Sequence, residues 1–164
     1  GGYQEDGFRA GTPSVSLISG MALAIELLNS PVNKNVNDVI TEYLKVSMYT
    51  KQLRTKLNEL DYITFTGHPN RRLNNHISML VGTIDKKPIN GRAFVRVLSE
   101  NGICASSGTA CSSKLDKGSS ILKEMNIPSC WRQSALRLSL GGWLKEKDID
   151  IIPKIIQESI RSLE

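Results

Sequence analysis

The chain has 164 residues, of which 40% are hydrophobic and 23% are charged, close to the average mixture of soluble globular domains. This composition excludes collagen-like, disordered and disulfide-scaffold proteins. The length is sufficient for one sizeable core, so we expect one domain, or one domain with part of a second. No apolar run approaches the roughly 18 to 20 residues of a membrane-spanning helix, and we expect no membrane partner.

The net charge of +5 reflects 21 Lys and Arg residues against 16 Asp and Glu residues, and it favours an anionic ligand or partner. The basic residues are dispersed, with Arg71-Arg72 and Lys86-Lys87 as the only adjacent pairs. Only three Phe, two Trp and four Tyr residues are available to stack on bases. These features do not favour direct binding of nucleic acid.

The three cysteines, Cys104, Cys111 and Cys130, are an odd number without a C-x-x-C pair, which argues against a disulfide framework and a zinc site. Cys104, on a strand predicted to be buried, and Cys130, in a loop, are expected to be inert. His68 and His76 have no partner at metal-ligand spacing, so no metal site is predicted. Free thiols are typical of a reducing compartment, and we expect a cytoplasmic protein. The chain starts with two glycines and no initiator Met, so its natural start is expected upstream and an organellar location is the alternative.

The first dozen residues contain four glycines and predict irregular backbone. Thr12 and Pro13 then match a helix N-cap followed by Pro at the first helical position, and apolar residues at helical spacing predict a helix over about 13–29. The polar stretch NSPVNKNVN, residues 29–37, is the best candidate for a linker. We therefore place a domain boundary near residue 31, which divides the chain into residues 1–30 and 31–164.

Periodic apolar patterns predict the remaining elements. Steps of three and four residues predict a long amphipathic helix from residue 37 or 38 to residue 60, which we expect to lie along a domain interface. The sequence then predicts, in chain order, strands over 62–66 and 77–81, a helix over 91–101 closed by Gly102, a short strand over 103–106, a loop over 107–117, a helix over 119–125, a strand over 135–140 and a helix over about 146–163. Pro153 fits best in the first turn of that last helix, which leaves its start open. The pattern indicates an α+β domain in which helices cover one side of a small sheet.

Residues 106–113, SSGTACSS, are all small and include a thiol. Such a segment buries little surface, so we expect it to be exposed. Cys111 is therefore a candidate reactive cysteine, and Lys114 and Lys117 would favour its thiolate. The alternative is that Cys111 is only a small residue in a tight turn.

Two further residues are candidates for binding anionic groups. Thr12 follows a glycine-rich stretch at a predicted helix N-terminus, where free amides, the helix dipole and a hydroxyl favour a phosphate. The alternative for Thr12 is an ordinary N-cap. Arg137 is polar on an otherwise apolar strand, on the face opposite the leucines, and could bind a carboxylate through both arms of its guanidinium. The alternative for Arg137 is a surface salt bridge.

The chain contains the segments GGYQEDGFRAGTPSV (1–15), CASSGTACSS (104–113) and ALRLSLG (135–141). These three segments resemble signatures of the C-terminal part of cysteine desulfurases. The resemblance is to the nitrogen-fixation and iron-sulfur-assembly branch of the class V aminotransferases, which depend on pyridoxal phosphate (PLP), and it covers essentially the whole chain. It implies that residues 1–30 end the PLP-binding large domain, with its phosphate-contacting turn and helix. Residues 31–164 would form the small C-terminal domain of a fold-type I PLP enzyme. That domain would follow a long interdomain helix, contain a mostly antiparallel sheet covered by helices, and carry a persulfide loop.

The resemblance also implies a role for each candidate residue. Cys111 occupies the position of the nucleophile that attacks the sulfur of PLP-bound cysteine and becomes a persulfide. Arg137 occupies the position that holds the substrate carboxylate, and Thr12 the position that reaches the PLP phosphate of the neighbouring subunit in a homodimer. Ser14 is a small departure, since several relatives carry Asn there.

A larger departure is that none of the twelve lysines stands in the Ser-x-His-Lys setting of the Schiff-base lysine, which the family carries upstream of these segments. PLP chemistry needs that lysine, so we expect this chain alone to be inactive. The full-length enzyme is expected to convert L-cysteine to L-alanine and to pass sulfur from Cys111 to an acceptor or scaffold protein, for iron-sulfur cluster assembly or tRNA thiolation. Two alternatives are a selenocysteine lyase or other class V PLP enzyme, and a non-catalytic module that accepts sulfur or binds a partner.

Overall fold

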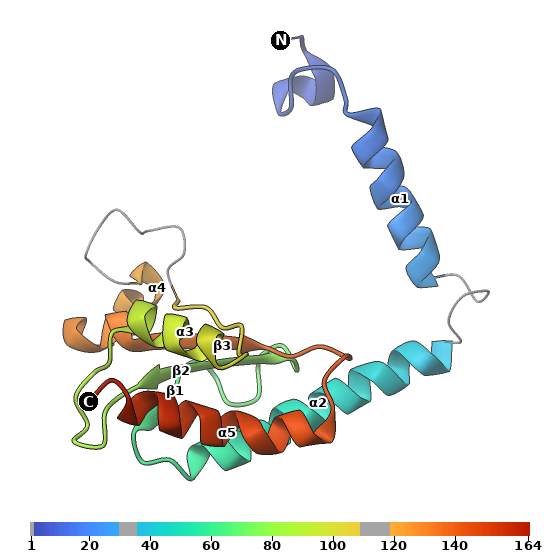
Figure 1. The fold of residues 1–164 in the computed structure, drawn as a ribbon. Coiled ribbons are helices and arrows are strands. Elements are labelled where there is room, and N and C mark those ends of the chain that lie inside the picture. The colour runs from blue at the N-terminus through green and yellow to red at the C-terminus, as the bar shows by residue number, and fades with distance from the viewer. Residues whose placement is uncertain (1, 30–35, 109–118) are drawn as a thin grey trace. The chain divides into compact units, whose positions relative to one another are not determined.

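The computed structural model describes residues 2–29, 36–108 and 119–164, and its contacts divide the chain into two compact units, Gly1–Glu42 and Tyr43–Glu164. The first unit contains a short 3-10 helix, η1 (Gln4–Gly7), and the helix α1 (Val15–Asn29), both drawn in blue in Figure 1. The predicted domain boundary near residue 31 lies outside the described residues and stays a prediction.

The start of α1 differs from the predicted one. The first helical hydrogen bond runs from the amide of Ile18 to the carbonyl of Ser14, at 3.0 Å, so Ser14 and not Thr12 occupies the N-cap position. Ser is as good an N-cap residue as Thr, and Pro13 disfavours helical backbone at the residue that precedes it. Thr12 is therefore an exposed residue ahead of the helix and does not cap it.

The long amphipathic helix is confirmed as α2 (Val36–Asn58). Its second half buries one stripe at steps of three and four residues, made of Val46, Tyr49, Leu53 and Leu57. Leu44, in the first half of the helix, is 58% exposed. The apolar spacing therefore predicted both the helix and the face that the second unit buries.

The second unit is built on a three-stranded antiparallel sheet in the order β1 (Ile63–Phe65), β2 (His76–Val81) and β3 (Ala135–Ser139). Ile77 pairs with Leu138, and Met79 pairs with Leu136. Because side chains alternate across a strand, these residues share one face, and all four are buried in the main core. The predicted α+β class and antiparallel sheet are confirmed.

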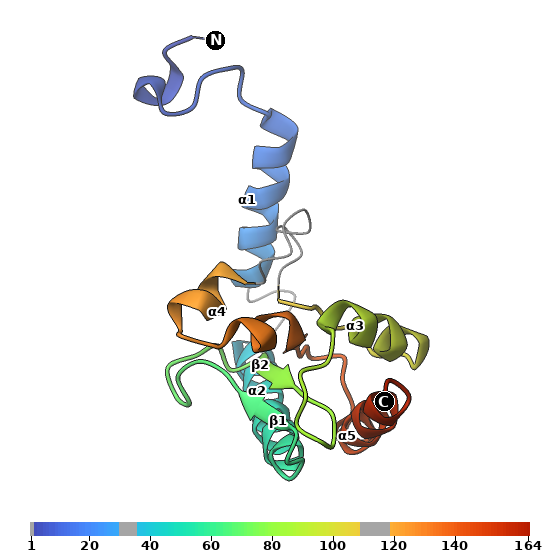
Figure 2. The ribbon, with the colours of Figure 1, turned by 90° about the vertical axis from the view of Figure 1, so that its left-hand side faces the viewer.

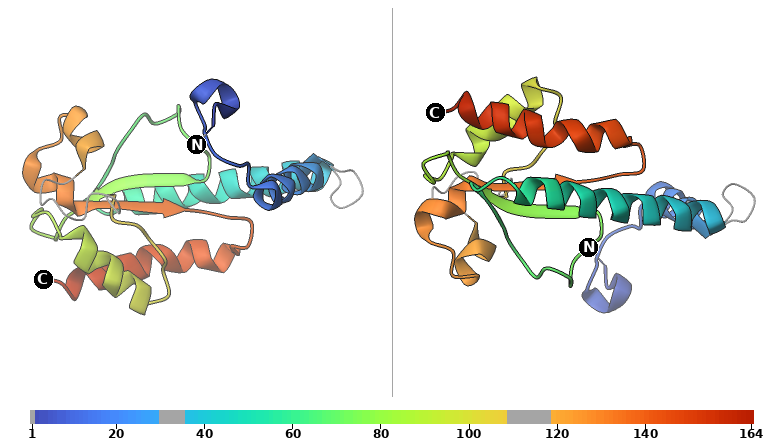
Figure 3. Two further views of the ribbon diagram at one scale, coloured as in Figure 1. Left: turned by 90° about the horizontal axis from the view of Figure 1, so that it is seen from above. Right: turned by 90° about the horizontal axis from the view of Figure 1, so that it is seen from below.

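Helices α2, α3 (Gly91–Glu100) and α5 (Glu146–Arg161) complete this core. Figure 3 shows α2 and α5 running beside the sheet, with α3 next to α5. The side chain of Asn90 accepts hydrogen bonds from the first amides of α3, and Gly102 follows that helix with φ +81°, as its predicted stop requires. The last helix starts at Glu146, so Pro153 lies inside it and not in its first turn. Buried Ile149 and Ile156 on either side of the proline hold the helix against the core.

The opposite face of the sheet is partly covered, contrary to the expectation of one covered side. Leu80 and Ala135 pack there with Leu122 of α4 (Ser120–Glu124). The 3-10 helix η3 (Ser129–Ser134) lies beside α4, and Figure 2 shows both elements in orange above β2. This apolar cluster protects one end of that face and leaves the other end open.

The strand expected over 103–106 is absent from the described structure. Only Ser106 pairs with a strand, in an isolated bridge to Arg137. Cys104 precedes this bridge and is exposed, so the expectation of a buried strand at Cys104 was wrong. The apolar residues Ile103 and Ala105 are partly buried against the core, which explains the strand-like alternation without strand pairing.

Candidate functional site

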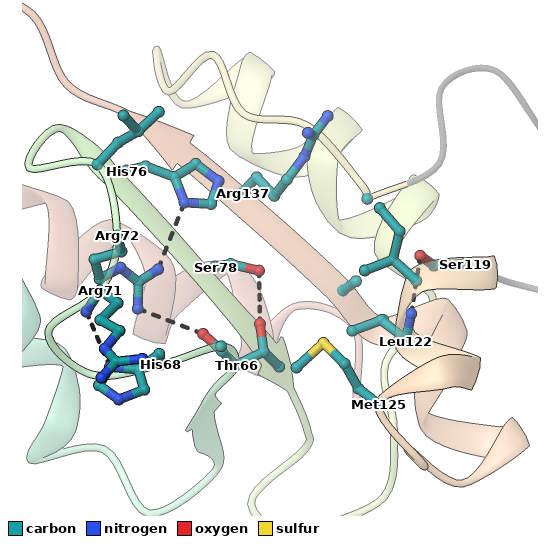
Figure 4. Close-up of a pocket in the computed structure, with 15 residues that line it drawn as sticks. Thr66, His68, Arg71, Arg72, His76, Ser78, Ser119, Leu122, Met125 and Arg137 are labelled. Atoms are coloured by element: carbon teal, nitrogen blue, oxygen red, sulfur yellow. Dashed lines mark hydrogen bonds between the residues drawn. The ribbon is translucent and has the colours of Figure 1, made fainter.

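A pocket of about 350 Å³ occupies the open end of the second sheet face. Figure 4 shows its lining side chains: Thr66, Arg72, His76, Ser78 and Arg137 surround the pocket, and Leu122 and Met125 close it on the side of α4. The pocket combines a polar wall from the strands with an apolar wall from a helix. Such a combination is typical of small-molecule sites.

Arg137 lies in this pocket because of the strand register. It pairs with Ser78 across β2 and β3, and its neighbours Leu136 and Leu138 point into the core, so its side chain is placed on the pocket face. The guanidinium Nη2 donates a hydrogen bond to the hydroxyl of Ser106 at 3.1 Å. The predicted position of Arg137, opposite the buried leucines, is confirmed.

Arg72 and His76 come from the end of the β1–β2 connection and the start of β2. The Arg72 guanidinium donates through Nη1 to the carbonyl of Thr66 at 3.4 Å, and its Nη2 lies 3.5 Å from Nδ1 of His76 (Figure 4). Since arginine can only donate, Nδ1 of His76 is the acceptor and the neutral ring carries its proton on Nε2. The Thr66 and Ser78 hydroxyls share a hydrogen bond of 2.6 Å on the same face.

The pocket is cationic. Arg71, Arg72 and Arg137 line it, and no Asp or Glu is among its described lining residues. Burial, together with the neighbouring charges of Arg72 and Arg137, lowers the pKa of His76 below its ordinary value. Burial also lowers the pKa of Arg72, and the charge of Arg54 adds to this effect. The site therefore favours an anionic ligand and a neutral His76.

Cys111 lies outside the described residues, so the structure does not test its predicted role. The described residues on either side of 109–118, Gly108 and Ser119, both line the pocket. The amide of Gly108 donates to the carbonyl of Ala135, which holds Gly108 close to the sheet. As a result, a Cβ added at Gly108 would lie only 3.1 Å from the Cβ of Ala135. Gly108 and Ser119, the described residues on either side of the segment that contains Cys111, thus both lie at the pocket.

Thr12 belongs to the first unit, and its surroundings are described there alone. The loop before it is fixed by a hydrogen bond from the amide of Gly11 to the side chain of Gln4, and by one from Arg9 to the carbonyl of Gly11. Thr12 is exposed, and the first amides of α1 that follow it have no acceptor within the helix. A hydroxyl, free amides and a nearby guanidinium are a donor set that fits a phosphate group.

The sequence reasoning found Arg137 but missed Arg72 and His76. In the sequence, Arg71-Arg72 is only one of two adjacent basic pairs, and the spacing of His76 bears only on metal binding. The signal was present in the alternation of β2, where His76 and Ser78 interrupt the apolar pattern on the face that also carries Arg137.

Two negative findings apply to the part of the chain that the structure describes. No three His, Cys, Asp or Glu side chains there lie close enough to hold a metal ion. Within the same residues, no helix has both the length and the apolar character needed to cross a membrane.

Two solved structures share the fold of this chain. A NifS-like protein from Rickettsia africae matches with a TM-score of 0.72 and 23% identity, over 98% of this chain and 39% of that one. A second NifS-like protein matches with a TM-score of 0.69 and 24% identity, over 99% of this chain and 38% of that one. The fold is therefore that of a part of a NifS-like protein.

The sequence comparison identifies the family. The family model for class V aminotransferases matches residues 3–152, and this chain belongs to that family, whose members depend on PLP. Cysteine desulfurase 2 of Trichormus variabilis is 34% identical over 96% of this chain, and the cysteine desulfurase IscS of Methanosarcina thermophila is 29% identical over 99% of it. The chain spans 37% of the length of each of these two relatives. The predicted family and its cofactor are confirmed.

Proposed function

We propose that this chain is the C-terminal part of a PLP-dependent cysteine desulfurase, which converts L-cysteine to L-alanine and retains the sulfur as a persulfide on Cys111. The observation that carries the proposal is the position of Arg137 in a cationic pocket whose lining includes both residues that flank the segment of Cys111. The relatives named cysteine desulfurases support the same reaction.

Arg137 is the proposed ligand of the substrate carboxylate. Its guanidinium presents parallel N–H groups that match a carboxylate with two hydrogen bonds. The hydroxyl of Ser106 accepts from only one of these groups, which leaves the remaining donors for a substrate. The absence of an acidic side chain among the described lining residues means that no described carboxylate in the pocket competes with the substrate.

Cys111 is the proposed nucleophile. It follows Gly108 by three residues, and three residues span at most about 11 Å, so its Cα cannot lie farther than that from a residue that lines the pocket. Its thiolate attacks the sulfur of the bound cysteine. An S–S bond forms, and the C–S bond breaks with its electron pair left on the substrate carbon, which takes up a proton and leaves as L-alanine.

Thr12 is proposed to bind the PLP phosphate, and when bound, PLP supplies the electron sink that carbon–sulfur cleavage requires. The donor set at Thr12 supports this role. In the resemblance, Thr12 reaches the phosphate of a neighbouring subunit, so we propose a homodimer. The free thiols of Cys104 and Cys130 support a cytoplasmic location for it. Since no lysine of this chain stands in the Ser-x-His-Lys setting, we expect this chain alone to be inactive.

The experiment is incubation of the longer protein that contains this chain with L-cysteine, followed by intact mass measurement and alanine analysis. The proposal predicts alanine and a mass gain of one sulfur atom, which Cys111→Ala abolishes. Cys104→Ala is the matched control, because Cys104 is an exposed free thiol nearby in sequence and should leave both results unchanged. Loss of the persulfide in Cys104→Ala instead would contradict the assignment of the nucleophile.

Competition between L-cysteine and L-selenocysteine distinguishes a cysteine desulfurase from a selenocysteine lyase. A desulfurase forms alanine from L-cysteine in the presence of the selenium analogue, whereas preferential release of selenium would assign a selenocysteine lyase. A longer protein that binds no PLP and forms no alanine would favour the non-catalytic module. Persulfide transfer from Cys111 to an added acceptor or scaffold protein tests the proposed partner, and the acceptor's mass is the readout.

A further inference from the structure

The Arg72 guanidinium has fewer good hydrogen-bond acceptors than its partial burial requires. Its Nε is buried and has no partner in the described structure. Its two contacts, to the carbonyl of Thr66 at 3.4 Å and to Nδ1 of His76 at 3.5 Å, are at the long limit for hydrogen bonds. Partial removal of a guanidinium from water without an ion partner has a cost, which an anion in the pocket would offset.

The charges around Arg72 point to the same conclusion. The charged residues that act on Arg72 and His76 are Arg54 from α2 and Arg137 from β3, and both are positive. Arg54 stacks on the ring of Phe65, with 4.4 Å between the guanidinium carbon and the ring centroid, and its Nη1 is also buried without a described partner. No Asp or Glu among the described lining residues offsets these charges.

His76 supplies a second donor beside the guanidinium. The Arg72 contact occupies Nδ1, which leaves the Nε2–H of the neutral ring without a described partner. His76 lies diagonally across β2 and β3 from Arg137, on the face that lines the pocket. A planar anion at this point would receive hydrogen bonds from a guanidinium and an imidazole.

We propose that Arg72 and His76 form a carboxylate-binding site in the pocket, separate from the position of Arg137. A carboxylate fits better than a spherical anion because its two oxygens match the planar fork of a guanidinium. The site does not depend on the reaction proposed above, since none of its residues takes part in that reaction. The carboxylate comes either from a free small molecule or from a side chain of the longer protein.

The test is an NMR titration of the 164-residue chain with acetate, with chloride at equal ionic strength as the reference. The chain has only two histidines, so the imidazole signals of His76 are assigned by their loss in His76→Gln. The Arg72 Nε–H signal is assigned by its loss in Arg72→Met. We expect acetate, but not chloride, to shift both signals with saturation.

Three variants locate the anion. Arg72→Met should weaken acetate binding, followed at His76, by about tenfold or more, because it removes charge-assisted hydrogen bonds. Arg72→Lys keeps the charge without the fork and should recover only part of this loss. Arg96→Met, at an exposed arginine of α3, is the control that removes the same charge and should leave binding unchanged. Unchanged methyl signals of the core show that each variant is folded.

Arg137→Met separates this inference from the proposed role of Arg137. If Arg72 and His76 hold the anion, acetate still shifts the Arg72 Nε–H signal in that variant. If acetate binding is lost in Arg137→Met and kept in Arg72→Met, the anion is held by Arg137 alone and the inference is overturned, while the proposed function stands. Absence of a saturable shift, an equal effect of chloride, or an equal loss in Arg96→Met would also overturn it.

Repeating the titration in the longer protein identifies the source of the carboxylate. A site for a free ligand still responds to acetate there. A site filled by a side chain of the protein no longer responds to acetate. In that case Arg72→Met should not restore acetate binding and should lower the free energy of unfolding. Both results support a carboxylate site, provided that the titration of the 164-residue chain gives the expected shifts.

Discussion

Ser106 and Arg137 are joined by three hydrogen bonds. The amide of Arg137 donates to the carbonyl of Ser106 at 2.7 Å, the amide of Ser106 donates to the carbonyl of Arg137 at 3.1 Å, and Arg137 Nη2 donates to the Ser106 hydroxyl at 3.1 Å. This bridge attaches the chain that leads to Gly108 and residues 109–118 directly to the strand that presents the pocket arginine. One contact therefore holds Arg137, which we propose binds the substrate carboxylate, to the chain that leads into the segment of Cys111.

The first prediction concerns this side-chain bond. In the longer protein, Ser106→Ala should raise the KM for L-cysteine about tenfold and change kcat less, because one charge-assisted hydrogen bond of about 1.5 kcal/mol no longer orients Arg137. The backbone bridge remains, so the strand itself is preserved. Steady-state alanine production measures the effect. Ser106→Thr keeps the hydroxyl and should restore the KM, whereas equal KM values in the alanine variant and the parent protein would argue against a positioning role.

The second prediction concerns the pH dependence of stability. Burial, followed by the charges of Arg72 and Arg137, lowers the pKa of His76 in the folded state below its ordinary value of 6.5. The unfolded chain therefore binds a proton more readily, and the free energy of unfolding should fall as the pH decreases from about 6.5 through the folded-state pKa of His76. Urea unfolding at a series of pH values measures this loss.

Variants assign the pH effect to His76. His76→Gln should remove this part of the loss, while His68→Gln, which changes the other histidine, should keep it. Arg72→Met removes one of the positive neighbours and should raise the pKa of His76, measured from its imidazole NMR signals. An unchanged His76 pKa in that variant would contradict the proximity of the two side chains.

Periodicity predicted the parts of this structure that are decided by burial. The spacing of Leu53 and Leu57 in α2, and the alternation of Leu136 and Leu138 around Arg137, follow directly from which side chains must leave water. The strand prediction failed where side chains are buried but the backbone does not pair with a strand. Residues 103–106 alternate because Ile103 and Ala105 contact the core, but only the backbone of Ser106 finds a strand partner.

The pocket could be predicted only in part because it depends on register. Arg137 is visible in the sequence as a charge between two leucines. Arg72 and His76 reach the same face only after β2 has paired with β3, and that pairing is a long-range contact that local spacing does not contain. The helix start shows a smaller limit, since Thr12 and Ser14 are both good N-cap residues and the choice between them is decided by backbone geometry around Pro13.

The third prediction concerns Gly91 at the start of α3. A Cβ at this position would lie 2.7 Å from the carbonyl oxygen of Gln133 and 2.9 Å from that of Ala135, so backbone would have to move. Gly91→Ala should therefore lower the free energy of unfolding by about 1–3 kcal/mol. Gly20→Ala is the control, because a Cβ there meets no atom within 4 Å. Urea unfolding followed by the fluorescence of Trp131 and Trp143 measures both, and equal stability of the two variants would contradict the close approach.

The fourth prediction compares two leucines of α2. Leu53 is fully buried, whereas Leu44 is 58% exposed in the same helix. Leu53→Ala should lower the free energy of unfolding by about 2–5 kcal/mol through lost burial and a cavity. Leu44→Ala removes the same atoms and should change it by less than about 0.5 kcal/mol, as expected for an exposed site. Equal losses in the two variants would show that the first half of α2 is also covered.

The last prediction concerns α1, whose apolar side chains are exposed on all sides. Val15, Leu17, Ile18, Met21, Leu23 and Ile25 are between 48% and 74% exposed. A helix that is apolar all round is normally buried, so we expect this surface to be covered in the longer protein and to drive association of the 164-residue chain. Light scattering over a concentration series should show an average mass that rises with concentration.

Substitution within α1 tests whether that helix causes the association. The double change Leu17→Glu and Met21→Glu should raise the dissociation constant about tenfold or more, because each apolar side chain contributes roughly 1.5–3 kcal/mol when buried. Leu73→Glu is the control, since Leu73 is 73% exposed in the second unit and should leave the association unchanged. A mass equal to one chain at every concentration would refute the prediction, and an equal effect of Leu73→Glu would place the associating surface outside α1.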